Sequence, residues 1–232
     1  MISVIIPAYN EERSIQDCFQ RIYNVLSSKG YDFEILLEQD GSSDRTPHII
    51  EELARRFDNV HALSFSERRG KGFGIRKCLE RARGEIAVII DADLEYPPEK
   101  IPEMVEKIRR TGTDIVVAQR VNAKRSLLRK VLSSFYRLIL KILFGKDFID
   151  PQSGLKVIRR AVIEEIWPIR SDGFEIDSEI LIRAHEKGFK ISYVPIAYVH
   201  RGNSKVSVLD PIKMLLSLIK WRFIWLRGKR VS

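Results

Sequence analysis

Short apolar runs alternate with amphipathic segments through the first half of the chain. Strands are expected where these runs lie, over residues 3–6, 33–37, 61–63, 86–90 and 114–118. Helices are expected over 14–26, 46–56, 70–82 and 97–110, where apolar residues recur every three or four positions. This alternation is typical of βαβ units, so the pattern predicts an α/β fold with a mainly parallel sheet and helices on both faces.

The second half is less regular. Residues 126–144 and 176–186 have helical periodicity, while residues 191–194 and 196–199 predict two short strands on either side of Pro195. A last helix is expected from Asp210 to about Leu226, because Pro211 suits its first turn. Lys and Arg side chains interrupt both this last helix and the one over residues 126–144, so neither is expected to span a membrane and no transmembrane segment is predicted.

Composition limits the class of protein. The 232 residues and 44% hydrophobic content suit one large globular domain and exclude a disordered or fibrous chain. Cys18 and Cys78 each lie in an amphipathic helical pattern, which excludes a disulfide framework or a zinc site. The start of the chain lacks the charged region and cleavage site of a signal peptide. These features predict a cytoplasmic setting.

The positive charge is concentrated in two segments. The net charge is +9, yet residues 120–146 carry eight basic and no acidic side chains, and residues 201–232 carry eight basic and one acidic. The remaining residues are slightly acidic on balance. Such clustering indicates an anionic partner, either a phosphate, a membrane surface or a nucleic acid.

Two aspartates follow the most apolar predicted strand. Asp91 and Asp93 come directly after residues 86–90, where the carboxyl end of a parallel strand opens on a ligand site. Paired carboxylates need a cation, and oxygen ligands favour Mg²⁺ or Mn²⁺ on a substrate phosphate. Glu95 is a candidate third ligand. The alternative is a pair of turn or capping aspartates before Pro97.

Two more acidic loops follow predicted strands, at residues 7–12 and 40–44. Asp40 and Asp44 are able to bind a base or ribose, but an Asx-turn with Asp44 capping the next helix explains them equally well. A helix-capping role is likewise enough to explain Glu11 or Glu12. The arrangement of three acidic loops at the ends of neighbouring parallel strands favours a shared cleft over three separate caps.

The three loops together resemble a known family. The sequences VIIPAYNEE from Val4, DGSSD from Asp40 and DADLEYPP from Asp91 are similar to those of family 2 inverting glycosyltransferases with the GT-A fold. The segments QSGLK, GFEID and RGNSK at residues 152–156, 173–177 and 201–205 resemble the dolichyl-phosphate mannose synthase-like, polyprenyl-phosphate glycosyltransferase branch. The resemblance implies a GT-A domain over 1–207, with a nucleotide-sugar half (1–119) and an acceptor half (120–207). Residues 208–232 are expected to form a basic amphipathic helix and tail.

The resemblance also implies roles for individual residues. The nucleotide pocket is expected to comprise Pro7, Ala8, Tyr9, Glu11, Asp40, Lys71, Asp91 and Ala92. Asp91, Asp93 and Glu95 are expected to hold Mg²⁺ or Mn²⁺, although relatives often have Gln at the third position. Arg120 is expected to contact the donor phosphates. The acceptor phosphate is expected to be bound by Arg129, Ser133, Arg201 and Lys205. The catalytic set is thus Asp91, Asp93, Arg120, Arg129, Arg201 and Lys205, with solvated surface charge as the alternative for each basic residue.

The implied activity is metal-dependent transfer of a mannose- or glucose-type sugar from a GDP- or UDP-sugar to a dolichyl or polyprenyl phosphate, with inversion. An acceptor phosphomonoester is already anionic near neutral pH and needs no strong base. A saccharide or other hydroxyl acceptor is the alternative, with Glu175 or Asp177 as base, although Asp177 also suits a helix N-cap. A nucleic-acid-binding protein is the alternative of another class, disfavoured by the acidic cleft.

The basic helices are expected to serve peripheral association with the cytoplasmic face of the membrane, because their apolar faces and Lys/Arg suit the interface. Packing of residues 126–144 on the core is an equal alternative. A homodimer contact is a further alternative for either helix.

Overall fold

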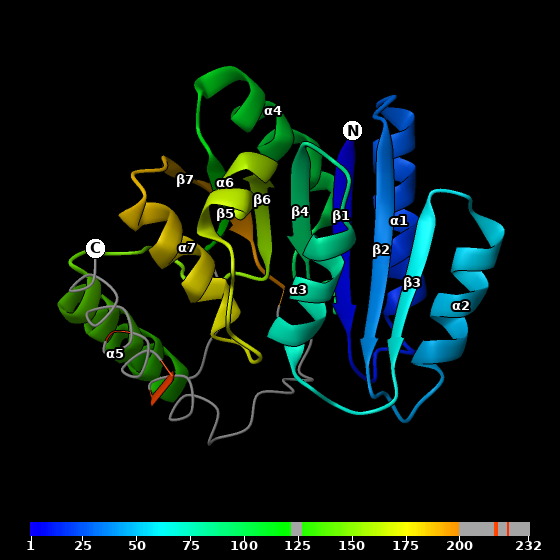
Figure 1. Cartoon of the computed structure of the whole chain (residues 1–232), viewed down its shortest axis with the longest axis horizontal. Helices are drawn as coiled ribbons and strands as arrows, with labels where there is room; N and C mark the ends of the chain where they lie inside the picture. The colour runs from blue at the N-terminus through cyan, green and yellow to red at the C-terminus, as the bar shows by residue number, and fades with distance from the viewer. Residues whose placement is uncertain (122–126, 200–215, 218–221, 223–232) are drawn as a thin grey trace.

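The computed structural model describes residues 1–121, 127–199, 216–217 and 222, without the side chains of 127–132. These residues form a seven-stranded sheet in the order β3-β2-β1-β4-β6-β5-β7 (Figure 1). The strands are β1 (Ile2–Ala8), β2 (Phe33–Asp40), β3 (Val60–Phe65), β4 (Ile86–Ile90), β5 (Ile115–Val121), β6 (Leu155–Arg159) and β7 (Ile191–Ala197). Six of them pair in parallel with a neighbour, and only β6 is antiparallel to both of its neighbours. The predicted mainly parallel sheet is confirmed.

Helices cover both faces of the sheet, as the alternating pattern predicts. They are α1 (Ile15–Ser28), α2 (Thr46–Arg56), α3 (Lys71–Arg81), the 3₁₀ turn η1 (Pro98–Lys100), α4 (Ile101–Thr111), α5 (Leu127–Phe144), α6 (Arg160–Ile166) and α7 (Ile176–Glu186). Apolar residues of α1, α2 and α4 form the core on one face, and those of α3, α5, α6 and α7 form the core on the other. Strand β1 is buried along its whole length, because both of its faces are covered.

Both cysteines lie in these cores. Cys18 of α1 and Cys78 of α3 are buried and carry free thiols. Burial raises the pKa of each thiol well above its usual range. The two cysteines belong to the cores on opposite faces of the sheet, so they cannot bond to one another.

The structure differs from the sequence-based expectation in the second half of the sheet. Strand β6 and helix α6 were not predicted, and β6 inserts between β4 and β5. Residues 191–197 form one strand rather than two, because β7 lies at the sheet edge and pairs only with β5. A proline on an edge strand costs no hydrogen bond on its open side, so Pro195 does not interrupt β7. The helix expected from Asp210 to Leu226 falls almost wholly outside the described residues.

A buried carboxyl group lies between β2 and α3. Glu38 is fully buried, and neither of its carboxyl oxygens has a hydrogen-bond partner among the described residues. A Cβ at Gly74 would lie 2.3 Å from the Glu38 carboxyl carbon, so only glycine leaves room for this side chain. Burial, with a smaller contribution from Asp40, raises the pKa of Glu38 to about 9. Glu38 is therefore neutral in the folded chain at pH 7.

Replacing Glu38 with glutamine is expected to stabilise the fold above pH 5. The unfolded chain releases this proton near its ordinary pKa of about 4.3, while the folded chain keeps it up to about pH 9. Between these values the unfolded state binds one proton fewer, so the free energy of unfolding falls as the pH rises, by about 1.4 kcal/mol per pH unit. Glutamine removes this dependence at nearly constant volume.

Urea unfolding at pH 5.5, 7.0 and 8.5 measures the effect. The advantage of Glu38→Gln over the unmodified chain should grow with pH, and Glu103→Gln on the exposed side of α4 should show no such trend. An advantage that stays constant with pH would contradict the buried neutral carboxyl group.

Candidate active site

The first two acidic loops meet at the carboxyl ends of β1 and β2. Main-chain N–H groups of the first loop donate to side chains of the second, Asn10 to Ser42 Oγ (3.1 Å) and Glu11 to Thr46 Oγ1 (2.8 Å). In return, Ser43 N–H donates to Asn10 Oδ1 at 2.8 Å. These contacts hold Tyr9 and Glu11 beside the Asp40 loop, as expected for strand ends at one edge of a parallel sheet.

Asp40 organises the segment that leads into α3. Its two carboxylate oxygens accept hydrogen bonds from the main-chain N–H groups of Arg69 (2.6 Å) and Gly70 (2.7 Å). In the same segment, the Arg68 guanidinium lies 4.0 Å from the centre of the Tyr9 ring. Asp40 therefore orders the approach to Lys71, a structural contact that the sequence did not predict.

The glycines around Lys71 allow two main chains to approach closely. A Cβ at Gly70 would lie 2.2 Å from the Asp172 carbonyl oxygen, and one at Gly72 would lie 2.4 Å from that of Ser171. The Gly72 N–H donates to the Asp172 carbonyl at 2.8 Å. The start of α3 is thereby fixed against the loop before α7, and Lys71 lies close to the first turn of α7.

Lys71 belongs to a row of four charged side chains. Its ammonium nitrogen lies 2.7 Å from Asp91 Oδ1 and 3.1 Å from Asp177 Oδ2. Asp177 Oδ1 in turn lies 2.5 Å from Lys156 Nζ, which also donates to the Ser153 carbonyl. Asp91 comes from the end of β4, Lys71 from α3, Asp177 from α7 and Lys156 from β6. Two carboxylates and two ammonium groups thus form one compact cluster.

Burial and the neighbouring charges shift the pKa of each member. Burial works against the charged form of Asp177, but Lys156 and Lys71 outweigh it and lower the pKa of Asp177. Burial also disfavours charged Lys71, yet Asp177 and Asp91 raise its pKa.

The N-cap of α7 is Glu175, so the interpretation of Asp177 as an N-cap was wrong. Held by two lysines, Asp177 is an ionised structural partner and a poor general base.

The surroundings of Asp93 disfavour the charged form of its carboxyl group. Burial and the nearby Asp91 raise the pKa of Asp93 to about 7. Its Oδ1 accepts the Glu95 N–H at 2.9 Å, across Leu94, whose φ of 58° is left-handed. A carboxylate with a raised pKa beside a second one is the donor set that a hard divalent cation stabilises, so Asp91 and Asp93 fit Mg²⁺ or Mn²⁺.

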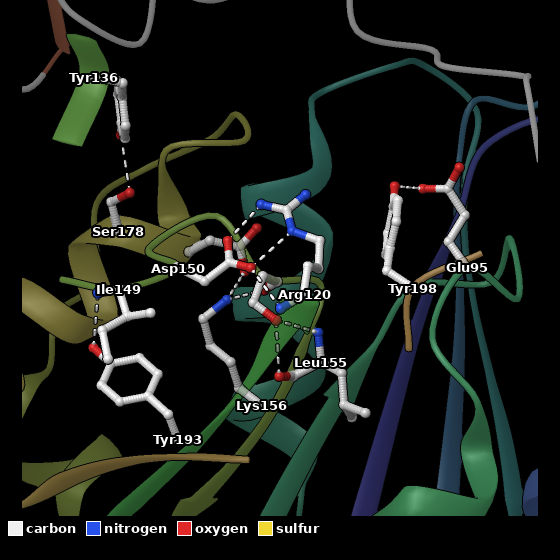
Figure 2. A network of polar contacts seen from close by, with 12 residues as sticks. Glu95, Arg120, Tyr136, Ile149, Asp150, Leu155, Lys156, Ser178, Tyr193 and Tyr198 are labelled. Atoms are coloured by element: carbon white, nitrogen blue, oxygen red, sulfur yellow. Dashed lines mark hydrogen bonds and ion pairs between the residues drawn. The ribbon is translucent and has the colours of Figure 1, made fainter. Parts of the chain in front are cut away.

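Glu95 faces a different partner in this conformation. The Tyr198 hydroxyl donates to its carboxylate (Figure 2). The Val199 N–H donates to its carbonyl at 3.2 Å. Within the described ranges, no three acidic, His or Cys side chains are grouped closely enough to hold a metal ion. The structure therefore brings together two of the three predicted metal ligands and directs Glu95 toward the segment after β7.

Arg120, at the end of β5, is held by Asp150. Its Nε and main-chain N–H donate to Asp150 Oδ2 at 2.8 and 3.0 Å, and its Nη2 donates to Oδ1 at 2.5 Å (Figure 2). The Tyr198 ring lies against the guanidinium at 5.5 Å. Such a forked contact fixes the guanidinium plane. Arg120 is thus a rigid cation at the strand ends, and its predicted contact with donor phosphates stays a prediction.

Comparison with known proteins identifies the family to which this chain belongs. Residues 3–167 match the model of glycosyl transferase family 2. The chain belongs to this family. The branch resemblance has support as well: a dolichol-phosphate mannosyltransferase from Pyrococcus furiosus is 33% identical over 95% of the chain. An undecaprenyl-phosphate 4-deoxy-4-formamido-L-arabinose transferase from Pseudomonas fluorescens is 30% identical over 94%. The chain spans 64% of the length of each relative.

A solved structure of similar fold is glucosyl-3-phosphoglycerate synthase from Mycobacterium tuberculosis in complex with Mn²⁺, uridine diphosphate and phosphoglyceric acid. It is 22% identical, with a TM-score of 0.71, and the alignment covers 94% of this chain and 78% of that one. This likeness confirms the GT-A fold for this family 2 member.

The residues expected to bind an acceptor phosphate are placed only in part. Ser133 is half-buried on α5, and Arg129 lies one helical turn before it, with a side chain outside the described part of the structure. Arg201 and Lys205 lie outside the described residues altogether. Their roles stay predictions. Among the helices that the structure describes, none combines the length and apolar character needed to cross a membrane.

Sequence reasoning missed Lys156, Asp150 and Tyr198 as partners of the site. One signal was present for Lys156, because it interrupts the apolar run of β6 and a lysine in such a run needs a buried anion. No comparable local signal marks Asp150 or Tyr198. Their partners lie 30 and 103 positions away in the sequence.

Proposed function

We propose that this family 2 member transfers a sugar from a GDP- or UDP-sugar to a polyprenyl or dolichyl phosphate at a membrane surface, with inversion and with Mg²⁺ or Mn²⁺. The observation that carries the proposal is the pair of carboxylates, Asp91 and Asp93, at the end of β4 beside the buried ammonium of Lys71. Two relatives named for transfer to dolichol phosphate and undecaprenyl phosphate support this class of acceptor.

The chain's own residues have defined tasks in this reaction. Asp91 and Asp93 hold the cation, which offsets the charge of the departing nucleoside diphosphate. Lys71 and Arg120 supply positive charge to the donor's phosphates, with Arg120 held in place by Asp150. Arg129, Ser133, Arg201 and Lys205 bind the acceptor phosphate. That phosphate attacks the anomeric carbon directly, because it is anionic at neutral pH.

A hydroxyl acceptor would need a general base, and Asp177 is a poor candidate. Its carboxylate oxygens are each bonded to a lysine, and its pKa is lowered. This argues against Asp177 as the base for a hydroxyl acceptor, and Glu175, at the N-cap of α7, stays the other candidate for that role.

A matched pair of acceptors tests the proposal. Radiolabelled GDP- and UDP-sugars are incubated with the protein, Mn²⁺ and either polyprenyl phosphate or the corresponding polyprenol. We expect label to enter the lipid phase with the phosphate only. Equal labelling of the polyprenol, or transfer to a saccharide with the phosphate inert, would overturn the choice of acceptor.

Membrane association is proposed to involve α5. Its Tyr136 and Leu140 are buried against the domain, and the Tyr136 hydroxyl lies 2.9 Å from Ser178 Oγ (Figure 2). Part of this helix thus packs on the core, which is one of the three expectations for it. Its Phe135, Leu138 and Ile142 are 56%, 52% and 73% exposed and form a stripe on the outer side. An apolar stripe within a segment of eight cations and no acids suits an anionic lipid surface.

Replacing Phe135, Leu138 and Ile142 together with serine is expected to lower binding to anionic lipid vesicles about tenfold or more, because the substitutions remove the apolar surface that enters the membrane. Sedimentation with vesicles of phosphatidylglycerol measures the effect. Trp167→Ser, at a partly exposed residue after α6, is the matched control and should bind like the unmodified chain. Unchanged sedimentation of the triple variant would exclude α5 as the contact.

A further inference from the structure

The row Asp91–Lys71–Asp177–Lys156 is balanced in charge without any ligand. Two ionised carboxylates and two ammonium groups sum to zero, and the contacts that join them are 2.7, 3.1 and 2.5 Å long. Lys156 is completely buried and the Asp177 side chain is 4% exposed. The outer end of the row, at Lys71 and Asp91, is the part that a ligand in the site can reach.

In this arrangement one oxygen of Asp91 is paired with a cation and the other packs against the main chain. Oδ1 holds the Lys71 ammonium. Oδ2 faces the main chain at Gly154, where a Cβ would lie only 2.0 Å from it. A divalent cation that uses Asp91 therefore meets the positive charge of Lys71 at the carboxylate oxygen it needs, and like charges at such a distance repel.

The Lys71 ammonium has a second carboxylate partner besides Asp91. Asp177 Oδ2 also accepts its ammonium, and Asp177 is fixed from the opposite side by Lys156. The diphosphate of a bound donor is anionic, so it can form an ion pair with Lys71 in place of Asp91. Once Lys71 turns to that diphosphate and to Asp177, the Asp91 carboxylate becomes available to the cation.

We propose that Lys71 is an exchangeable counterion of Asp91 through which the donor's diphosphate and the divalent cation bind cooperatively. Asp177 and Lys156 are positioning residues, because they determine the position of the Lys71 ammonium. This inference builds on the proposed metal-dependent function. Because coupling between two ligands is reciprocal, the diphosphate strengthens cation binding by the same factor as the cation strengthens diphosphate binding.

The decisive measurement is Mn²⁺ affinity of the nucleotide-free protein, from the electron paramagnetic resonance signal of free Mn²⁺. Lys71→Met removes the competing charge and is expected to tighten Mn²⁺ binding about tenfold, while binding of GDP or UDP without metal weakens. Asp177→Asn leaves Lys71 bound to Asp91 alone and adds net positive charge, so Mn²⁺ binding is expected to weaken about tenfold. A merely structural disturbance would move both variants in the same direction.

Two further variants complete the test. Lys77→Met removes an exposed lysine from the same helix and should leave Mn²⁺ affinity unchanged. Lys71→Arg keeps the charge and should stay near the unmodified chain. Thermal unfolding of each variant establishes that it is folded, and Asp177→Asn decides the matter alone if Lys71→Met does not fold.

The possible failures can be told apart. If Lys71→Met leaves nucleotide-free Mn²⁺ affinity unchanged or lowers it, the inference is wrong and the metal-dependent function stands. If the unmodified chain binds no Mn²⁺ either alone or with GDP or UDP, the proposed metal dependence fails and the inference fails with it.

Discussion

Alanine at position 93 is expected to lower the rate of sugar transfer at least about a hundredfold, because it removes one of the two carboxylates proposed to hold the cation that stabilises the departing diphosphate. The loss should not come from misfolding. Burial and Asp91 raise the pKa of Asp93 to about 7, which means that the fold disfavours its negative charge. A neutral side chain at this position should therefore leave the melting temperature unchanged or raise it.

Asp93→Asn is the informative companion, because it preserves shape and removes only the charge. It should lose activity like the alanine variant and melt no lower than the unmodified chain. Asp58→Asn, on the exposed turn before β3, serves as control and should retain full activity. Activity of Asp93→Ala within a few-fold of the unmodified chain would exclude a metal role for this residue.

Alanine at position 154 is expected to reduce transfer about tenfold or more while the chain still folds. Its methyl group would lie 2.0 Å from Asp91 Oδ2 and 3.1 Å from the Tyr96 ring, so the Asp91 carboxylate must move. Small displacements of a positioned group cost activity strongly. The substitution thus tests the position of Asp91 without removing it.

Gly112→Ala is the control for an added methyl group. Position 112 has no neighbouring atom within 4 Å but has a φ of 62°, so the substitution should cost about 1 kcal/mol of stability and leave the site intact. Transfer rate and melting temperature are measured for both variants. Full activity in Gly154→Ala would mean that the observed place of Asp91 is irrelevant to catalysis.

The first half of the fold follows closely from the sequence because its signals are local. Apolar runs of four to eight residues mark strands β1, β2 and β4, and a run that is buried on both faces has no other stable place than the centre of a sheet. Parallel strands direct their carboxyl ends to one edge, so the sequence alone predicts that the loops at Glu11, Asp40 and Asp91 share an edge.

The second half depends on contacts that no local pattern reveals. Strand β6 is five residues long, contains Lys156 and ends at Arg159, so it lacks the apolar run of a central strand. The structure accommodates Lys156 only because Asp177, 21 positions later, supplies a buried anion. Asp177 itself lies in the first turn of α7, where capping is an adequate local explanation, and its contact with Lys71 spans 106 positions. Partners of this kind emerge only when the chain is folded.

The most direct test of the proposed activity is release of nucleoside diphosphate in a series of reactions that each omit one component. With GDP- or UDP-sugar, Mn²⁺ and polyprenyl phosphate all present, the account predicts steady release that stops when any one is left out and resumes when it is restored. Release at an equal rate without the lipid phosphate, or in the presence of excess chelator, would contradict the account.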